Sequence, residues 1–271
     1  MNLFDLILIN PFLNVLVFFY QVLNSVSIPG ALGFAIILLT IIIRMALWPL
    51  TSVQLRSSQK MAALKPHLDR IKADHGHDKV LHQQEVSKLY KEHGVNPMAG
   101  CLPLLLQMPV FIALYQVLLK IVEFDKADFL SSINSRLLPI LHLDKAPQTS
   151  FLGFSLADKP NQWQQIGFLI LLVPLITGAL QFIQSKMMVP AATSKPAKTN
   201  EKQGLEDSMA QMQSQMILIM PLMIAFFSYG FPIGLSLYWN TFTIIGIIQQ
   251  YVIAGPGALG KYLPTKWEKG N

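Results

Sequence analysis

Five long apolar stretches constrain what this chain can fold into. A membrane-spanning helix needs about 20 apolar residues, because a rise of about 1.5 Å per residue must cover a hydrocarbon core about 30 Å thick. Five spanning helices are therefore predicted, at about 31–50, 102–119, 166–185, 216–231 and 233–254. Charged residues make up only 13% of the chain, against about 25% in a soluble domain. The chain is thus predicted to be an all-α integral membrane protein.

The N-terminal stretch, residues 1–28, is apolar but interrupted by polar residues. Asn10, Asn14, Gln21 and Asn24 fall within about 80° of one another at 100° per residue. A narrow polar stripe on an apolar helix is typical of a helix that lies in the membrane interface. We therefore predict an N-terminal interfacial amphipathic helix over 1–28, with a sixth spanning helix as the alternative.

The distribution of Lys and Arg predicts the orientation. Segments 51–100 and 186–215 and the tail after residue 254 together carry fifteen of them, whereas 120–165 carries five alongside five acids. Basic residues accumulate on the cytoplasmic side of membrane proteins. This count predicts an external N-terminus and a cytoplasmic C-terminus, which requires an odd number of spans and so agrees with five.

The segments outside the predicted spans differ in character. Within a core over 29–254, we expect a cytoplasmic helical hairpin at 51–99, an outer loop at 120–165 and a cytoplasmic linker at 186–215, followed by a short cytoplasmic tail at 255–271. The linker prediction rests on Pro190, Pro196 and many small residues, a composition that does not support a packed core.

The hairpin prediction rests on a repeating apolar pattern. Met61, Leu64, Leu68 and Ile71 recur at the spacing of a coiled-coil seam, and Val86 with Leu89 forms one face of a second helix. The sequence His75-Gly76-His77-Asp78 separates the two arms, and Pro66 is expected to kink the first. The loop also contains His67, His82 and His93. Because no Cys or acidic pattern accompanies the histidines, a solvated polar face is favoured over a metal site.

The predicted spans contain no Asp, Glu or His. Intramembrane aspartyl proteases need two carboxylates at membrane depth, serine and metal proteases need His, and proton-coupled carriers use a buried acid or His. We therefore predict that the chain is not an enzyme and that it requires no cofactor.

Arg44 is the one charged residue within the predicted spans, six residues before the end of the first. That spacing places it about 9 Å from the cytoplasmic end of the span. An arginine near the bilayer centre costs about 2.5–3.5 kcal/mol on insertion scales, so such residues usually serve a function. The alternative is an arginine whose side chain snorkels to the inner interface.

Polar residues on several spans favour a functional role for Arg44. Thr40 shares its helix face; Thr177, Gln181 and Gln184 share a face of the third span, while Asn240, Thr243 and Gln250 lie on one side of the fifth, and Gln107 lies early in the second. Most of them fall in the half predicted to be nearer the cytoplasm. Together they predict a wet, positively charged groove closed on the outer side. The alternative is that they join helices by hydrogen bonds worth about 0.6 kcal/mol each.

Several stretches resemble the YidC family of membrane-protein insertases, which includes mitochondrial and chloroplast relatives. The matching stretches are Thr40-Ile-Ile-Ile-Arg44, Trp48-Pro49-Leu50-Thr51, Leu89-Tyr90-Lys91, Val95-Asn96-Pro97, Gly100-Cys101-Leu102-Pro103-Leu104-Leu105-Leu106-Gln107-Met108-Pro109-Val110-Phe111, Ala113-Leu114-Tyr115, Phe231-Pro232-Ile233-Gly234-Leu235, Leu237-Tyr238-Trp239-Asn240 and Gln249-Gln250. They follow the order of the family and lie within residues 34 to 253.

The resemblance implies a five-helix core with a groove that opens to the cytoplasm and the lipid. Arg44 matches the arginine inside that groove, and Thr40, Tyr238 and Trp239 match positions at the groove or at the substrate contact. The hairpin matches the element expected to recruit substrate. The implied function is insertion of small nascent membrane proteins into a bacterial plasma membrane. The implied partners are those clients and membrane lipid, with the ribosome and the Sec translocon as further candidates; no direct nucleic-acid recognition is predicted.

The sequence also departs from the family and leaves other functions open. The outer loop is long, and its usual Trp-then-acid motif is replaced by Phe151-Leu-Gly-Phe154-Ser-Leu156. The tail is short and weakly basic, which argues against strong ribosome binding through it. The competing functions are a small anion carrier or channel that uses Arg44, and a structural assembly factor that binds finished membrane proteins. Replacing Arg44 by Gln would matter little to the assembly factor.

Overall fold

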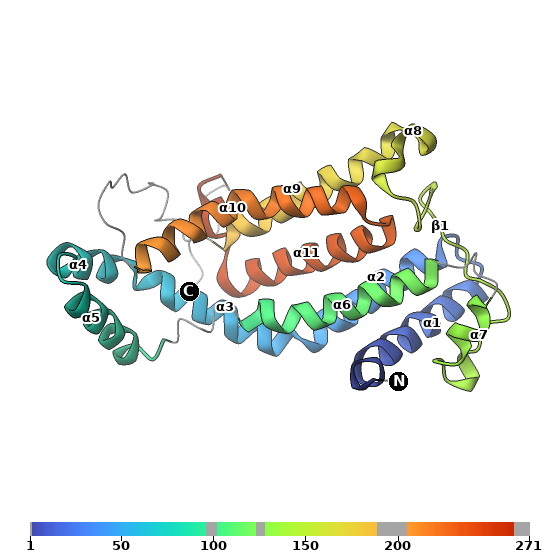
Figure 1. Ribbon diagram of the computed structural model, residues 1–271, viewed down its shortest axis with the longest axis horizontal. Coiled ribbons are helices and arrows are strands. Elements are labelled where there is room, and N and C mark those ends of the chain that lie inside the picture. The colour runs from blue at the N-terminus through green and yellow to red at the C-terminus, as the bar shows by residue number, and fades with distance from the viewer. Residues whose placement is uncertain (1, 96–101, 123–127, 189–204, 263–271) are drawn as a thin grey trace. The chain divides into compact units, whose positions relative to one another are not determined.

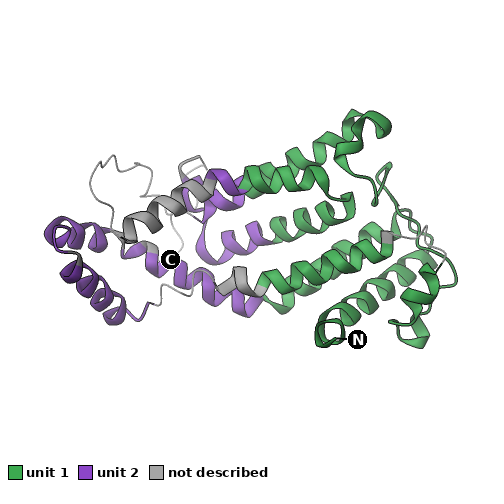
Figure 2. Cartoon of the chain, in the orientation of Figure 1, with its two compact units in different colours: residues 1–47, 105–181, 221–245 green, residues 48–104, 182–220, 246–271 purple. Residues whose placement is uncertain are grey.

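The computed structural model describes residues 2–95, 102–122, 128–188 and 205–262, most of which lie in helices (Figure 1). The chain divides into two compact units (Figure 2). Unit 1 comprises 1–47, 105–181 and 221–245, and unit 2 comprises 48–104, 182–220 and 246–271. Cys101 and residues 189–204 of the predicted linker lie outside the described residues.

Each predicted span contains a helix, but the bounds differ. The helices are α2 (Ala31–Ala46), α6 (Leu102–Val122), α9 (Leu172–Met187), α10 (Leu205–Gly230) and α11 (Ile233–Ala254). The tight turn between the last two is confirmed, since α10 ends at Gly230 and α11 begins at Ile233. The linker was predicted to extend to 215, which is wrong, because α10 already begins at Leu205.

The first predicted span extends too far. It was predicted to reach residue 50, but α2 ends at Ala46 and α3 (Trp48–Ala63) follows after a break at Leu47. A proline disfavours the helical conformation of the residue before it and lacks an amide donor, so Pro49 is acceptable only in the first turn of a new helix. The third helix likewise begins late, because Gly167 has a φ of 115° and a 3₁₀ turn, η5 (Phe168–Leu171), precedes α9.

Length and hydropathy alone mark fewer spanning helices than five. Within the described residues, Asp5–Ser25 and Phe168–Met187 are long and apolar enough to cross a membrane, and Ala31–Ala46 with Trp48–Met61 passes as a broken pair. Gln107–Ile121 and Leu218–Gly230 are shorter apolar helices. The five-span core therefore remains a prediction, and so does the assignment of the N-terminal helix to the interface.

The N-terminal helix packs within unit 1. Segment η1 (Asp5–Ile9) runs directly into α1 (Asn10–Ser25), whose apolar face is buried against α2 in the main core. The polar stripe is partly used by protein contacts rather than left for lipid headgroups. Asn14 donates to the carbonyl of Arg136 at 3.0 Å and accepts from the amide of Leu138 at 2.7 Å, and Gln21 donates to the carbonyl of Leu141 at 3.2 Å.

Short elements fill the predicted outer loop. They are α7 (Phe129–Asn134), η3 (Pro139–Leu141), β1 (Ser150–Phe151), β2 (Phe154–Ser155), η4 (Pro160–Gln162) and α8 (Trp163–Ile166). The two strands pair antiparallel, with Ser150 opposite Ser155 and Phe151 opposite Phe154. Leu152 and Gly153 connect them with φ angles of 51° and 88°, as a tight two-residue hairpin turn requires.

Unit 2 contains two packed helices within the segment predicted to form a helical hairpin. Helix α4 (Lys65–His75) and helix α5 (Lys79–Glu92) pack on each other. Leu64, Leu89 and Val95 form a small core, against which the predicted seam residues Met61, Leu68 and Ile71 pack. Pro66 is the second residue of α4, so the first arm is interrupted where the sequence predicts a kink. The Asp78 carboxylate caps α5 by accepting from two backbone amides. The last described element of this unit is a 3₁₀ helix, η7 (Gly257–Tyr262).

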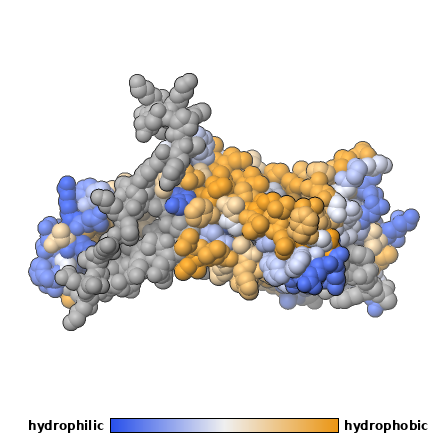
Figure 3. Space-filling view, turned by 90° about the horizontal axis from the view of Figure 1, so that it is seen from above, coloured by the Kyte–Doolittle hydropathy of each residue, from blue (hydrophilic) through white to orange (hydrophobic). Residues whose placement is uncertain are grey.

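The helices of unit 1 expose apolar side chains as lipid contact requires. Leu175 on α9 is 66% exposed, and Leu222 and Phe226 on α10 are 66% and 72% exposed. Figure 3 shows hydrophobic residues gathered over much of one face of the molecule. Such a surface is costly in water and favourable against lipid chains.

Candidate functional site

Eight of the nine predicted groove residues belong to unit 1, and Gln184 belongs to unit 2, where it is half-buried. The eight lie on four helices of unit 1. They are Thr40 and Arg44 on α2, Gln107 on α6, Gln181 on α9, and Tyr238, Trp239, Asn240 and Thr243 on α11. The structure therefore brings the predicted residues of these helices into one compact unit, and it leaves Gln184 outside it.

Arg44 points towards α11. Its guanidinium donates two hydrogen bonds to the backbone carbonyl of Phe242, at 3.1 Å from Nε and 2.8 Å from Nη2. The same group lies over the Phe242 ring, 3.4 Å from its centroid. Arg44 is 5% exposed, so its side chain is packed against protein. These contacts favour the interior position over snorkelling. Neither contact neutralises the positive charge, because a carbonyl and an aromatic ring are both neutral.

Phe242 was not among the predicted site residues. It lies one helical turn after Tyr238 on α11, and the two rings are 5.9 Å apart. The i, i+4 spacing from a predicted groove residue was the available signal. Because its main contribution is a backbone carbonyl, its residue type gave no indication of that role.

A hydrogen bond joins α6 to α11. Gln107 Nε2 donates to the hydroxyl of Tyr238 at 2.8 Å. Tyr238 is 1% exposed, so this bond satisfies a polar group that burial would otherwise leave without water. The two residues were predicted independently, Gln107 from its place early in the second span and Tyr238 from the family resemblance, and the structure pairs them.

A second hydrogen bond joins α9 to α11. The indole of Trp239 donates to Gln181 Oε1 at 3.2 Å. The indole ring also meets Phe111 of α6 edge-on, with 5.3 Å between centroids, and Phe111 stacks on Tyr115. Trp239 is half-buried. One face of the site is therefore an aromatic surface, on which the Gln181 amide fixes the Trp239 ring. The sequence predicted Gln181 and Trp239 as site residues, but it did not predict Phe111 and Tyr115 as neighbours of Trp239.

The remaining predicted residues have different surroundings. Thr40 is 1% exposed and donates to the carbonyl of Ile36 in its own helix at 2.7 Å. Thr243 is also 1% exposed. The Oδ1 atom of Asn240 is buried and has no hydrogen-bond partner among the described residues. Asn240 can therefore accept a hydrogen bond from a water molecule or from a polar group of a substrate.

A chain of hydroxyl groups links α9, α10 and α11. Ser228 bonds to Thr177 at 3.3 Å and to Ser236 at 2.9 Å, and all three side chains are buried. Sequence analysis placed Thr177 on one face with Gln181 and Gln184 in a wet groove. The structure instead pairs Thr177 with Ser228 of α10, which matches the alternative of interhelical hydrogen bonding.

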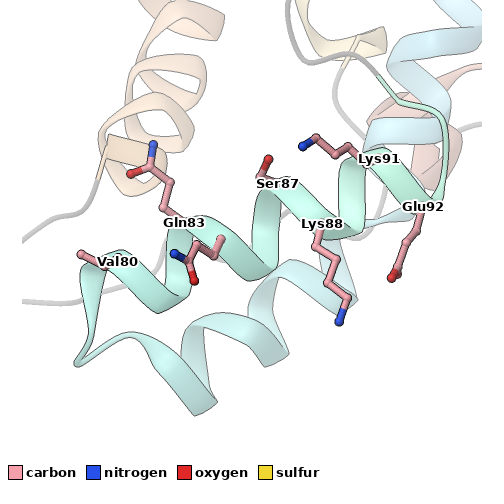
Figure 4. A pocket seen from close by; sticks show the side chains of 7 residues that line it. Val80, Gln83, Ser87, Lys88, Lys91 and Glu92 are labelled. Carbon is pink, nitrogen blue, oxygen red and sulfur yellow. The ribbon is translucent and has the colours of Figure 1, made fainter.

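In unit 2, helix α5 borders a surface hollow of about 630 Å³ (Figure 4). The described residues that line it include Gln83, Ser87, Lys88, Lys91 and Glu92. Lys88 lies 4.0 Å from Glu85 with 63% of its side chain exposed, so this ion pair is weak. Within the described part of the chain, no three His, Cys, Asp or Glu side chains are grouped as a metal would require.

The family model described as "60Kd inner membrane protein" matches residues 22–257, most of the chain. The chain belongs to this family, which is the YidC family of insertases. The match includes every helix that carries the predicted groove residues. As a YidC-family chain with apolar helices, it is an all-α protein of the bacterial inner membrane.

Individual YidC proteins agree with the family assignment. The membrane protein insertase YidC of Fusobacterium nucleatum is 35% identical over 229 residues, which cover 84% of this chain and 89% of that protein. The YidC of Pseudoalteromonas atlantica is 35% identical over 227 residues, and that of Rickettsia rickettsii is 36% identical over 225 residues. These cover 84% and 83% of this chain, but only 34% and 35% of those longer proteins.

A solved structure gives the same result. The crystal structure of an active YidC insertase with its first transmembrane domain resolved superposes with a TM-score of 0.57 at 27% identity. The similarity covers 94% of this chain and 47% of that one. Both the fold and the sequence therefore match the YidC family along nearly the whole chain.

Proposed function

We propose that this chain inserts small nascent membrane proteins into the lipid bilayer through a hydrophilic, positively charged groove open to the cytoplasm. The observation that carries the proposal is the position of Arg44. It is the one charge in the predicted spans, and it is held inside unit 1 by two hydrogen bonds to α11. The YidC proteins that resemble this chain are named membrane protein insertases.

The proposed mechanism lowers the free-energy barrier to moving a polar segment of the client across the membrane. A polar segment that crosses hydrocarbon loses the water bound to its backbone groups, at several kcal/mol for each unsatisfied group. A groove that reaches partway through the membrane replaces some of that lipid with water and with side chains that form hydrogen bonds, such as Asn240 and Gln181. Arg44 attracts an acidic outer segment of the client for a short time, because opposite charges attract more strongly where little water screens them.

The apolar helix of the client then moves along α9 and α11 into lipid. Clients that fit this mechanism have one or two spans and short, modestly charged outer segments. The mechanism requires no nucleotide and no metal. In the orientation that the basic residues support, the N-terminus is outside and the C-terminus is in the cytoplasm. The helical hairpin in unit 2 would receive the client, with the ribosome and the Sec translocon as candidate partners.

Site-specific cross-linking tests whether a client meets this site. A photoreactive residue at position 181 or 239 should cross-link to a ribosome-stalled single-span client in native membranes. The matched control is position 18 on α1, where Phe18 is 49% exposed and lies on a different helix of the same unit. Equal cross-linking at all three positions would mean random contact through lipid and would contradict the proposal.

A further inference from the structure

The segment 149–158, named here the cap segment, covers the end of unit 1 at which α2 and α11 begin. It contains the β1–β2 hairpin and the motif Phe151-Leu-Gly-Phe154-Ser-Leu156. Two of its backbone carbonyls accept hydrogen bonds from the first amides of α11. The amide of Ile233 donates to the carbonyl of Asp158 at 2.8 Å, and the amide of Gly234 donates to the carbonyl of Leu156 at 2.9 Å. The first amides of a helix have no partner within the helix, so these bonds attach the cap segment to α11.

The cap segment also fills a notch in α2. Phe151 lies against Gly30 and Gly33 so closely that a Cβ atom on Gly33 would be 2.1 Å from its ring. Any side chain at Gly33 would therefore displace the ring. Phe34 meets the same ring edge-on at 5.3 Å, and Phe151 is 7% exposed. The two glycines thus provide a socket for one aromatic side chain.

Leu156 bridges the two helices. It is fully buried, and a Cβ atom on Gly234 of α11 would meet the Leu156 side chain at 3.5 Å and Ile36 of α2 at 3.7 Å. Leu156 therefore occupies the space between α2 and α11. These are the helices that carry Arg44 and Tyr238.

The cap segment is braced internally. The hydroxyl groups of Thr149 and Ser155 lie 2.9 Å apart, and the Asp158 carboxylate accepts from the amide of Ser155 at 2.8 Å. The amide of Leu156 donates to the carbonyl of Thr149 at 2.8 Å. These bonds satisfy several polar groups of the turn locally, so the cap segment presents Phe151 and Leu156 to the helices from a braced turn.

We infer that the cap segment is a permeability seal, with Phe151 and Leu156 as the plug that keeps water and small ions from passing between α2 and α11. The inference rests on the proposed function in one respect: a seal is needed only if water reaches Arg44 from the other end of these helices. Two buried apolar side chains across that route leave no polar path for an ion, and transfer of an ion through an apolar layer is costly.

The test is passive ion leak through the purified full chain in liposomes, without any client. Liposomes loaded with K⁺ are diluted into K⁺-free buffer, and K⁺ release is followed with an electrode. Wild type should match empty liposomes, and Phe151→Ala should release K⁺ several-fold faster. The matched control is Leu152→Ala, since Leu152 lies on the same hairpin but is 82% exposed; it should remain as tight as wild type.

A second variant keeps the test decisive if Phe151→Ala does not fold. Gly33→Ala leaves Phe151 intact but places a methyl group where the ring lies, so it should also increase K⁺ release. Gel filtration and circular dichroism in detergent identify which variants are folded. A folded Phe151→Ala or Gly33→Ala protein as tight as wild type, or a Leu152→Ala protein that leaks equally, would overturn the inference. Client insertion is scored separately, so a tight variant that inserts normally refutes the seal and leaves the insertase proposal standing.

Discussion

At the level of single residues, Arg44 and Phe242 form the most specific contact of the site. The guanidinium binds both the backbone carbonyl and the ring of Phe242, and a flat guanidinium can do both where a lysine cannot. A cation over an aromatic ring in a desolvated position contributes about 2 kcal/mol. The contact therefore offsets part of the hydration that the Arg44 guanidinium loses on burial.

Replacing Phe242 by Leu tests the ring alone, because the backbone carbonyl remains. We expect thermal unfolding in detergent to show a loss of about 1–2 kcal/mol of stability. Ile244→Ala is the matched control on the same helix, since Ile244 is 44% exposed, and it should change stability little. A Phe242→Leu protein no less stable than this control would mean that the ring does not hold Arg44.

The bond between Gln107 and Tyr238 can be measured by a double-mutant cycle. Tyr238→Phe removes the accepting hydroxyl and should cost about 0.6 kcal/mol, as interhelical hydrogen bonds in membranes do. With Gln107→Leu already present, the same change should cost nothing. Additive effects in the unfolding free energies would show that the bond does not contribute.

The sequence predicted the residues of the site better than their partners. Arg44 and Gln107 could be identified because a charge or an amide is rare in an apolar stretch, and Tyr238 could be identified from the family resemblance. Phe242 and Phe111 could not, because an aromatic residue is ordinary in such a stretch and acquires its role only when another helix approaches. Thr177 was placed in a wet groove by its helical face, but Ser228, the serine that it contacts, lies 51 residues further along the chain.

At the level of elements, close helix contact depends on small residues. A Cβ atom on Gly178 of α9 would be 3.0 Å from Cβ of Ala225 on α10. Small residues at helix interfaces allow such an approach in membranes. The buried hydroxyl chain through Ser228 joins the same two helices to α11, so packing and hydrogen bonds act together there.

Gly178→Val should force α9 and α10 apart. Overpacking of this kind costs about 1–3 kcal/mol, which a melting curve of the detergent-solubilised protein would show. Ala179→Val adds the same type of side chain at the next position, which is exposed, and it should be nearly neutral. If both variants melt alike, the close contact is not a determinant of stability.

The cap of α5 is a separate test in unit 2. The Asp78 carboxylate accepts from the amides of Val80 and Leu81, at 3.0 and 3.1 Å. Asp78→Ala should destabilise the start of α5 by about 1 kcal/mol. Hydrogen exchange should therefore accelerate at these two amides, whereas His77→Ala should leave them unchanged. Unchanged exchange in the Asp78 variant would contradict the capping role.

Most elements were predictable and their ends were not. The seam of the hairpin and the start of α11 follow from local apolar spacing and a Pro-Ile step, both visible in the sequence. The break at Leu47 depends on one proline near the end of an apolar stretch, and hydropathy averaged over the stretch conceals it. The socket for Phe151 depends on the absence of a side chain at Gly33, which no apolar pattern reveals.

At the level of the whole molecule, the family assignment, the helical fold and the buried charge of Arg44 all support the insertase proposal. The chain belongs to the YidC family over most of its length, and its helices bring eight predicted groove residues into one unit. The proposed seal and the proposed groove lie at opposite ends of α2 and α11. One end keeps ions from crossing, and the Arg44 end receives the polar segment of a client.

The measurement that tests this account most directly is insertion of a small two-span client into liposomes that contain the purified chain, scored by protease protection. Wild type should protect more client than empty liposomes do. Arg44→Ala should lose most of this gain, and Arg44→Lys should keep part of it because the charge remains. Full activity in Arg44→Ala would contradict the role of the buried charge, and a wild-type protein no better than empty liposomes would contradict the insertase proposal itself.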